Sequence, residues 1–226
     1  MDMKASKVYN GIMKRADAPT ITKALIEWLD NRYEDKTITT EIALNTSLGV
    51  KVADVVVSNG HSVAYEIKSA FDTTKRLKEQ LLGYSEMFEY VYFVYWADKY
   101  ELSSLPIPKS TGIIRAYFSD DGVAFKVEKK AKINRNLTPK MGAEFLWKKE
   151  LRYFLRLKGE KFKMSDDKGR LVELFLKNYK KRDSIKIFRH ILKHRFALGF
   201  EKYKESKELS VYKKHKCDIN YTLEYS

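Results

Sequence analysis

The Asn59-Gly60 pair joins two apolar runs, and this short junction constrains the fold more than any other segment of the chain. The runs are KVADVVVS (51–58) and SVAYEIK (62–68). An Asn-Gly pair between two strand-like segments is the strongest short-range signal for a β-hairpin. Because segments with helical periodicity lie on both sides of it, we expect the hairpin to belong to an α/β protein.

The length of the turn decides which charged side chains share one face of the hairpin. With a two-residue loop, Asp54 pairs with Tyr65, and Glu66 points to the other face. A three-residue loop, which Gly60 allows in a left-handed conformation, brings Asp54, Glu66 and Lys68 together. We predict the three-residue loop because it gives each of the three charges a partner, and a charge in an apolar strand is costly without one.

Two carboxylates and an ammonium group in one place suit the hydrolysis of a phosphate ester. Carboxylates are hard oxygen ligands for Mg²⁺, which keeps several waters and bridges to a phosphate. A lysine can orient or deprotonate the attacking water and offset negative charge on the phosphate oxygens. A buried salt bridge between Lys68 and one of the carboxylates is the structural alternative, and spacing alone does not separate the two interpretations.

The other expected elements follow from periodicity and turn signals. We predict strands at 37–44, 90–96, 112–118 and 123–130, and helices at 20–32, from Asp72 as N-cap to about Phe88, and at 141–157, 168–180 and 184–196. The run at 90–96 is apolar throughout, which is typical of a central strand that is buried on both faces. Together these elements predict a mixed central β-sheet flanked by helices, followed by a helical extension.

The positive charge is concentrated in the helical part. The formal net charge is +14, of which residues 1–140 contribute +3 and residues 141–226 contribute +11. Such a surplus indicates a polyanionic partner, nucleic acid first of all. We therefore expect an α/β core at 1–137 and, packed on it, a basic helical extension at 138–226 that presents a nucleic-acid-binding face. The expected cationic contacts are Arg76, Lys148, Lys149, Arg182, Arg189, Lys193 and Arg195.

No segment predicts a membrane protein. The longest apolar stretch, 90–97, has eight residues, whereas a spanning helix needs about 20. The first 20 residues contain no apolar run of the kind found in a signal peptide. We expect a cytoplasmic protein without a membrane partner.

The hairpin and the segment after it carry a resemblance to a known superfamily. The strings ADVVV (53–57) and YEIKS (65–69), followed by Asp72, Gln80 and Tyr84, resemble the PD-(D/E)xK nucleases, in a poorly characterised bacterial and phage branch. The resemblance is dense between 39 and 96 and thin after 146. One departure is that Ala53 stands where the name of the superfamily implies proline. The resemblance implies a restriction-endonuclease-like fold.

The resemblance also implies roles for individual residues. Asp54 and Glu66 would be metal ligands and Lys68 the catalytic lysine. The superfamily places a further acidic residue upstream, for which the chain offers Glu41 and Glu27. We prefer Glu41, which sits in a predicted strand, to Glu27, which lies off the apolar stripe of its helix.

Gln80 and Tyr84 match the Q-x-x-x-Y element of RecB-type nucleases, in which these residues shape the site near the DNA. They are four residues apart on a predicted helix and therefore share a face. Gln80 is expected to join the catalytic group and Tyr84 to contact nucleic acid. Core packing is the other interpretation of Tyr84, and the two are compatible.

The function that this reasoning predicts is Mg²⁺- or Mn²⁺-dependent cleavage of phosphodiester bonds, in DNA first. Two alternatives stay open: a catalytically inactive nucleic-acid-binding module of the same fold, and an RNA-cleaving toxin or effector. Many nucleases of this fold act as dimers, so the resemblance also suggests a homodimer.

Overall fold

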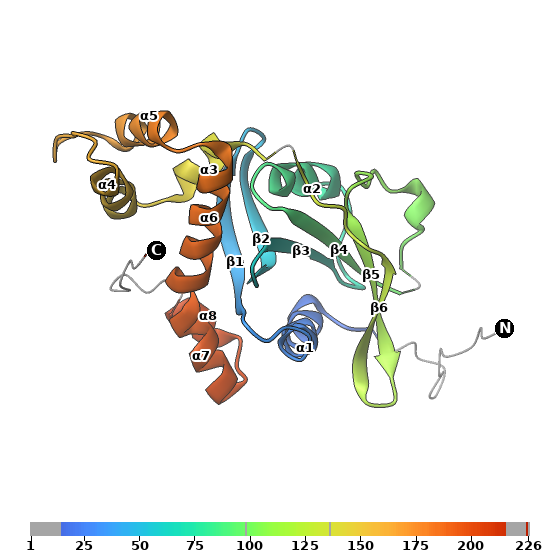
Figure 1. Cartoon of the computed structure of the whole chain (residues 1–226). Helices are drawn as coiled ribbons and strands as arrows, with labels where there is room; N and C mark the ends of the chain where they lie inside the picture. The colour runs from blue at the N-terminus through green and yellow to red at the C-terminus, as the bar shows by residue number, and fades with distance from the viewer. Residues whose placement is uncertain (1–14, 98, 136, 216–224, 226) are drawn as a thin grey trace.

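A six-stranded mixed sheet forms the centre of the protein, with helices on both faces (Figure 1). The computed structural model describes residues 15–97, 99–135, 137–215 and 225. The strands lie in chain order across the sheet, and only the β3–β4 and β4–β5 pairs are parallel. The strands are β1 (Thr37–Thr46), β2 (Gly49–Ser58), β3 (Ser62–Lys68), β4 (Tyr90–Trp96), β5 (Gly112–Ser119) and β6 (Gly122–Lys129). The predicted α/β class and mixed sheet are confirmed.

Eight α-helices are present in the described residues. They are α1 (Ala18–Asp30), α2 (Leu77–Ser85), α3 (Pro139–Phe145), α4 (Lys148–Leu157), α5 (Lys168–Asn178), α6 (Lys181–Arg195), α7 (Ala197–Ser206) and α8 (Ser210–Lys214). A short 3-10 helix, η1 (Leu102–Ser104), lies between β4 and β5. None of the helices in this part of the chain is both long enough and apolar enough to cross a lipid bilayer.

The hairpin has the predicted three-residue loop. Ser58 pairs with Ser62, so the loop consists of residues 59–61, and Gly60 takes the left-handed conformation with φ +88°. This register places Asp54 and Glu66 at the same level of the two strands, as predicted from the need of each charge for a partner.

The two faces of the sheet are covered by different helices. On one face, α1, α7 and α8 close an apolar core in which Leu25 and Phe200 pack with Val57. On the other face, α2 and α6 close a second core that contains Leu81 and Phe188. Helices α3, α4 and α5 pack with α6 in a third cluster beside the sheet. The helical extension therefore contributes to both layers that cover the sheet.

At one level of strands β1 and β2, the alternation of side chains between the two faces of the sheet is interrupted. Ile38 belongs to the core under α1, whereas Ile42, an even number of residues further along, belongs to the core under α2 and α6. Glu41, between them, has φ +53°, a value that few residues other than glycine adopt. Strand alternation has a period of two residues, so one irregular residue moves all later side chains to the other face. Asp54 lies opposite Glu41 in this irregular stretch of the ladder.

Two predicted helices differ most from the observed ones, whereas the ends of the other predicted helices are shifted by no more than three residues. Helix α2 begins at Leu77 rather than after Asp72, because the Asp72 carboxylate accepts a hydrogen bond from the Ser69 amide (2.8 Å) and so closes a turn at the end of β3. The helix predicted at 141–157 is two helices, α3 and α4. Glu150 accepts a hydrogen bond from the amide of Trp147 (2.6 Å), which starts a new helix there.

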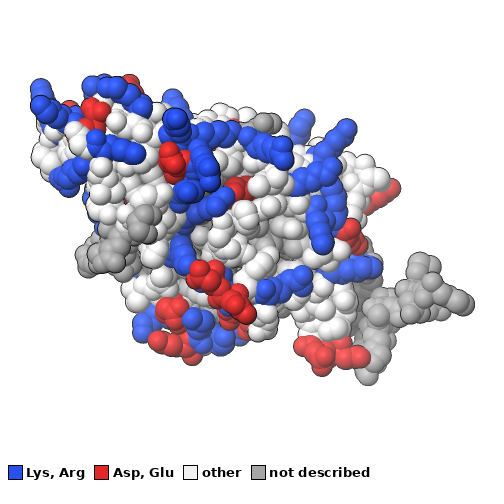
Figure 2. Space-filling view, in the orientation of Figure 1, with Lys and Arg blue, Asp and Glu red and all other residues white. Residues whose placement is uncertain are grey.

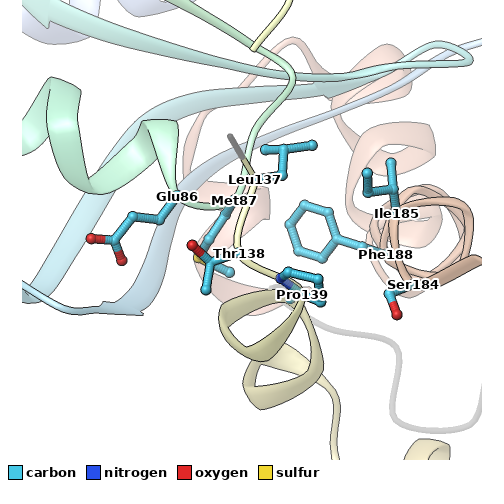
Figure 3. A pocket seen from close by; sticks show the side chains of 9 residues that line it. Glu86, Met87, Leu137, Thr138, Pro139, Ser184, Ile185 and Phe188 are labelled. Carbon is cyan, nitrogen blue, oxygen red and sulfur yellow. The ribbon is translucent and has the colours of Figure 1, made fainter. Parts of the chain in front are cut away.

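Helix α6 is fastened to the sheet by an ion pair and by apolar contacts. The Arg189 guanidinium binds both carboxylate oxygens of Glu89, a buried residue that also accepts a hydrogen bond from the Ser62 amide (2.9 Å). Where α6 meets the α2–β4 turn, Phe188 and its neighbour Ile185 face the segment around Leu137 (Figure 3). The cavity left at this seam is about 10 Å³, no more than one water molecule needs. Helix α6 of the extension therefore packs closely on the core.

A second ion pair is buried deeper, between α6 and the start of α4. Arg195 is 2% exposed and Glu150 is fully buried, and the guanidinium binds both oxygens of that carboxylate. It also lies over the rings of Phe145 and Trp147, at 4.4 and 4.2 Å from their centroids. Arg195, expected to contact nucleic acid, is instead a structural residue, because its charge is enclosed by these groups.

Arg195→Ala is expected to lower the free energy of unfolding by about 3–5 kcal/mol, because it leaves the Glu150 carboxylate buried without its cation. Arg182→Ala, at an exposed position of the same helix, is the matched control and should change stability by less than about 0.5 kcal/mol. Urea unfolding of both variants checks this. Equal effects would show that the Arg195–Glu150 pair contributes nothing specific.

Candidate active site

The candidate site lies where strands β2 and β3 separate. The two strands pair only from Val55 to Ser58 and from Ser62 to Tyr65. Beyond that point β2 continues along β1, and β3 continues along β4. Asp54 and Glu66 are the first residues of the two separated segments, and α2 packs against both strands. We call this separation of β2 and β3 the fork. Asp54 and Glu66, the predicted acidic residues, lie at its base.

Asp54 occupies the gap that the fork opens in the hydrogen-bond ladder. Its Oδ2 atom accepts a hydrogen bond from the backbone amide of Ile67 (2.7 Å), a donor that the absent β2 pairing leaves open. Burial and the nearby Glu66 carboxylate raise the pKa of Asp54 to about 7. Near neutral pH this carboxyl is therefore divided between its protonated and charged forms.

Glu66 is fully buried on the α2 side of the sheet. Burial raises its pKa above the ordinary value, and the ammonium of Lys68 opposes that rise. Lys68 donates a hydrogen bond to Oε1 of Glu66, so the ion pair expected as the structural alternative is present. The ion pair does not exclude the catalytic interpretation, because the second carboxylate, that of Asp54, lies next to Glu66 and Lys68.

Lys68 is held by two partners. Besides Glu66, its ammonium donates to the side-chain oxygen of Gln80 on α2 (3.1 Å). The residue is 8% exposed. Gln80 thus lies next to the Asp54, Glu66 and Lys68 group and holds the ammonium of the lysine.

Tyr84 closes the fork from the α2 side. Its hydroxyl lies 2.5 Å from the Val52 carbonyl oxygen on β2 and 2.5 Å from Oε2 of Glu66 on β3. A phenol donates one hydrogen. With Glu66 ionised beside Lys68, the hydroxyl donates its hydrogen to one of these two oxygens at a time. Tyr84 has no exposed surface, so the prediction that it contacts nucleic acid is wrong, and core packing is its role.

Asp72 is a neighbour of the site that the sequence reasoning assigned only to a helix cap. Its negative charge is among the causes that raise the pKa of Asp54, and its carboxylate is held by the Ser69 amide just after β3. Its presence in the string that resembles the nucleases was the available signal. The structure thus places a third carboxylate close to the Asp54–Glu66 pair.

Neither upstream acid joins this group. Glu41 is exposed, and its positive φ breaks the alternation of β1, so its preferred place among the metal ligands is wrong in this structure. Glu27 is on α1, which covers the opposite face of the sheet, and its charge acts on Tyr203 of α7. In the described segments, no three His, Cys, Asp or Glu side chains are gathered as a metal-binding group.

The sequence matches a family model across the sheet and most of the helical part. The model describes bacteriophage P4 protein cII and matches residues 13–218. The chain belongs to the phage P4 cII family. Protein cII of Enterobacteria phage P4 is a curated relative, 34% identical over 143 residues, which are 62% of this chain and 53% of the relative. The chain thus spans about half the length of that relative. Since one match crosses the predicted boundary between 1–137 and 138–226, the family includes the core and the extension together.

The basic surface of this cII family member differs from the predicted one. In Figure 2, Lys and Arg side chains spread over the upper part of the face, from α4 and α5 across the top, whereas acidic ones gather toward the bottom, over α7. Of the expected contacts, Arg76, Lys149 and Arg182 are exposed and Lys148 is half-buried. Arg189 and Lys193 are bound to Glu89 and Asp35.

Proposed function

We propose that the protein is a metal-dependent nuclease of the PD-(D/E)xK type that hydrolyses phosphodiester bonds in DNA. The observation that carries the proposal is the convergence of Asp54, Glu66 and Lys68 at the base of the β2–β3 fork. One buried and one half-buried carboxylate with raised pKa values, next to a lysine, are the kind of perturbed group that clusters at catalytic sites.

The two carboxylates fit a divalent cation by their chemistry. Burial raises the pKa of both, so each would ionise more readily beside a positive ion. Mg²⁺ is usually held by one or two carboxylates together with waters and substrate phosphate, so Asp54 and Glu66 suffice as protein ligands. The ion, Mg²⁺ or Mn²⁺, would supply a Lewis acid for the phosphate and an acidified water.

The remaining residues of the fork have supporting roles in the proposed reaction. The ammonium of Lys68 can stabilise negative charge on the phosphate oxygens or orient the attacking water. Gln80 keeps that ammonium in place through its side-chain oxygen (3.1 Å). Tyr84 holds the Glu66 carboxylate at the level of Asp54, so the site is preorganised by α2.

The charge distribution supports a nucleic-acid substrate. The net charge is +14, and basic side chains line the upper part of the face in Figure 2. Lysine and arginine bind phosphates independently of base sequence, and they do so by releasing counterions. The exposed residues Arg76, Lys149 and Arg182 are the proposed backbone contacts.

A non-catalytic nucleic-acid-binding module is the second candidate. It is favoured by Glu66, whose two oxygens are bound by Lys68 and Tyr84, and by the lack of a three-ligand group among the described residues. In that case the ion pair would serve stability only, and the protein would bind nucleic acid without cutting it.

Incubation of the purified chain with supercoiled plasmid and with folded RNA, in Mg²⁺, Mn²⁺ or EDTA, separates these candidates. The nuclease proposal expects metal-dependent nicking of DNA that Asp54→Asn abolishes. Binding of nucleic acid without any cleavage product in Mg²⁺ or Mn²⁺ would identify the protein as the non-catalytic binding module. Cleavage of RNA alone moves the substrate to RNA, and equal cutting by the Asp54→Asn protein refutes the proposed site. A homodimer stays a prediction, which sedimentation velocity would check.

Salt dependence is expected to locate the backbone contacts. Lys149→Ala and Arg182→Ala should each reduce the slope of log K against log[salt] by about 1, because each removes one phosphate contact. Lys202→Ala, on α7 and next to Glu205, is the control and should leave the slope unchanged. Fluorescence anisotropy with a labelled duplex measures all three. Unchanged slopes in the first two variants would place the DNA on another face.

A further inference from the structure

A second cavity lies on the face of the sheet opposite the fork. Tyr65 lines it, and Glu66, the next residue of β3, points to the other face, as strand geometry requires. Its volume is about 140 Å³, similar to that of an engineered protein cavity of about 150 Å³ that binds benzene. The lining residues are Trp28, Arg32, Tyr33, Tyr65, Tyr92, Ile114, Val127 and Lys130.

The interior of this cavity is aromatic. Tyr65 and Tyr92 stack with their ring centroids 5.3 Å apart and their planes 11° from parallel. Tyr65 is 1% exposed, and burial raises its pKa, as does its contact with Tyr33. Burial likewise raises the pKa of Tyr92, so the phenols of Tyr65 and Tyr92 stay protonated. The wall offers flat apolar surface together with hydroxyl donors, which suits a planar ring with polar atoms at its edge.

Two cations stand at the exposed side of the cavity. Arg32, at the end of α1, and Lys130, after β6, are both exposed. The Arg32 guanidinium lies 4.3 Å from the centroid of the Trp28 ring, a contact that limits its freedom. Within the described residues neither side chain forms an ion pair with a carboxylate, so their donors are open to an anion.

We propose that this cavity binds a nucleobase together with its phosphate. The base would pack against the tyrosine wall, since stacking on aromatic rings accepts any base. The phosphate would bind Arg32 and Lys130, because a guanidinium matches phosphate oxygens in geometry as well as charge. The ligand is either a free nucleoside monophosphate or the terminal nucleotide of a strand. The proposal does not depend on the proposed nuclease activity.

Calorimetric titration of the intact chain tests this directly. The probes are the four deoxynucleoside 5′-monophosphates, deoxyadenosine, deoxyribose 5-phosphate and a five-nucleotide strand with a 5′-phosphate. At least one monophosphate or the strand is expected to bind at one site per chain. Deoxyadenosine and deoxyribose 5-phosphate should each bind at least tenfold more weakly, because each lacks one half of the recognised group.

Variants at the edge of the cavity leave the core intact. Arg32→Ala and Lys130→Ala are expected to weaken binding at least tenfold. Lys126→Ala, on β6 and exposed, does not line the cavity and should bind as the wild type does. Asp54→Asn should also bind normally, so failure of the nuclease proposal and failure of this one are distinguishable.

The outcomes divide clearly. Binding of the monophosphates identifies a free nucleotide as a ligand, and binding of the strand alone identifies a strand end; both support the proposal if Arg32→Ala weakens them. Three results would overturn it: no binding of any nucleotide or strand, equal binding by the Arg32→Ala and Lys130→Ala proteins, or binding of deoxyribose 5-phosphate as tight as that of the nucleotides.

Discussion

Lys68→Met is expected to lower the rate of metal-dependent DNA cleavage by about 10²–10⁴-fold, the range found when a positioned acid–base group or a charge-stabilising donor is removed. Methionine keeps an unbranched side chain that is one heavy atom shorter, and it removes the charge. The loss should appear at saturating metal, because the carboxylates that would bind the ion remain. Initial rates on supercoiled plasmid, measured across Mg²⁺ concentrations, give the cleavage rate at saturating metal and the metal concentration that is needed for half of it.

Lys51→Met is the matched control for this substitution. Lys51 is also on the hairpin, but its ammonium binds Glu79 and the Leu48 carbonyl outside the fork. This variant should cleave at a rate close to that of the wild type. Normal cutting by Lys68→Met would remove the lysine from the mechanism, and equal loss in both variants would show a general effect on the sheet. Circular dichroism confirms that each variant is folded.

Asp54→Asn is expected to stabilise the protein at alkaline pH. The pKa of Asp54 is about 7 in the folded protein against 3.8 in a model compound, so between these values the folded state binds more protons than the unfolded one. Stability is then fully present below pH 4 and falls as the pH rises through 7. The whole difference is at most about 4 kcal/mol, and partial contact with solvent reduces it.

Urea unfolding at pH 5, 7 and 9 measures this effect. The wild type should lose stability over that range, and Asp54→Asn should lose clearly less, with the remaining slope due to Glu66. Asp35→Asn is the control: the hydrogen bond from Lys193 lowers the pKa of Asp35 from its ordinary value of 3.8, so its contribution to stability is lost only at lower pH and stays constant between pH 5 and 9. Mg²⁺ should restore stability at pH 9 to the wild type and not to Asp54→Asn. Parallel pH profiles for wild type and Asp54→Asn would contradict the buried, protonated carboxyl.

The hairpin could be predicted because its chemistry and its turn agree. The need of Asp54, Glu66 and Lys68 for partners favours a three-residue loop around Gly60, and the observed register contains that loop. The bounds of β3 and β4 are those predicted, since both strands are short apolar runs with clear ends. Local patterns suffice where each residue favours the same element as its neighbours.

The errors have a different origin, in contacts between distant segments. No local pattern shows that Glu41 has a positive φ or that the Tyr84 hydroxyl bonds to Val52 across the fork. The basic composition of its helix predicts that Arg195 is a surface cation, whereas Glu150, 45 residues earlier, is the buried partner that binds it. The local sequence around Asp72 is compatible with a helix cap and with a closed turn, and in the structure Asp72 closes the turn.

The attachment of α6 to the sheet has a consequence for how this chain can be divided. Phe188, Leu192 and Phe196 belong to the same core as Leu81 and Phe88. A fragment that ends at residue 137 would expose that apolar face to water and leave Glu89 without its guanidinium partner. The acidic fork and α6 therefore belong to one folding unit, and neither can be exchanged for the corresponding part of another protein without rebuilding the surface that they share.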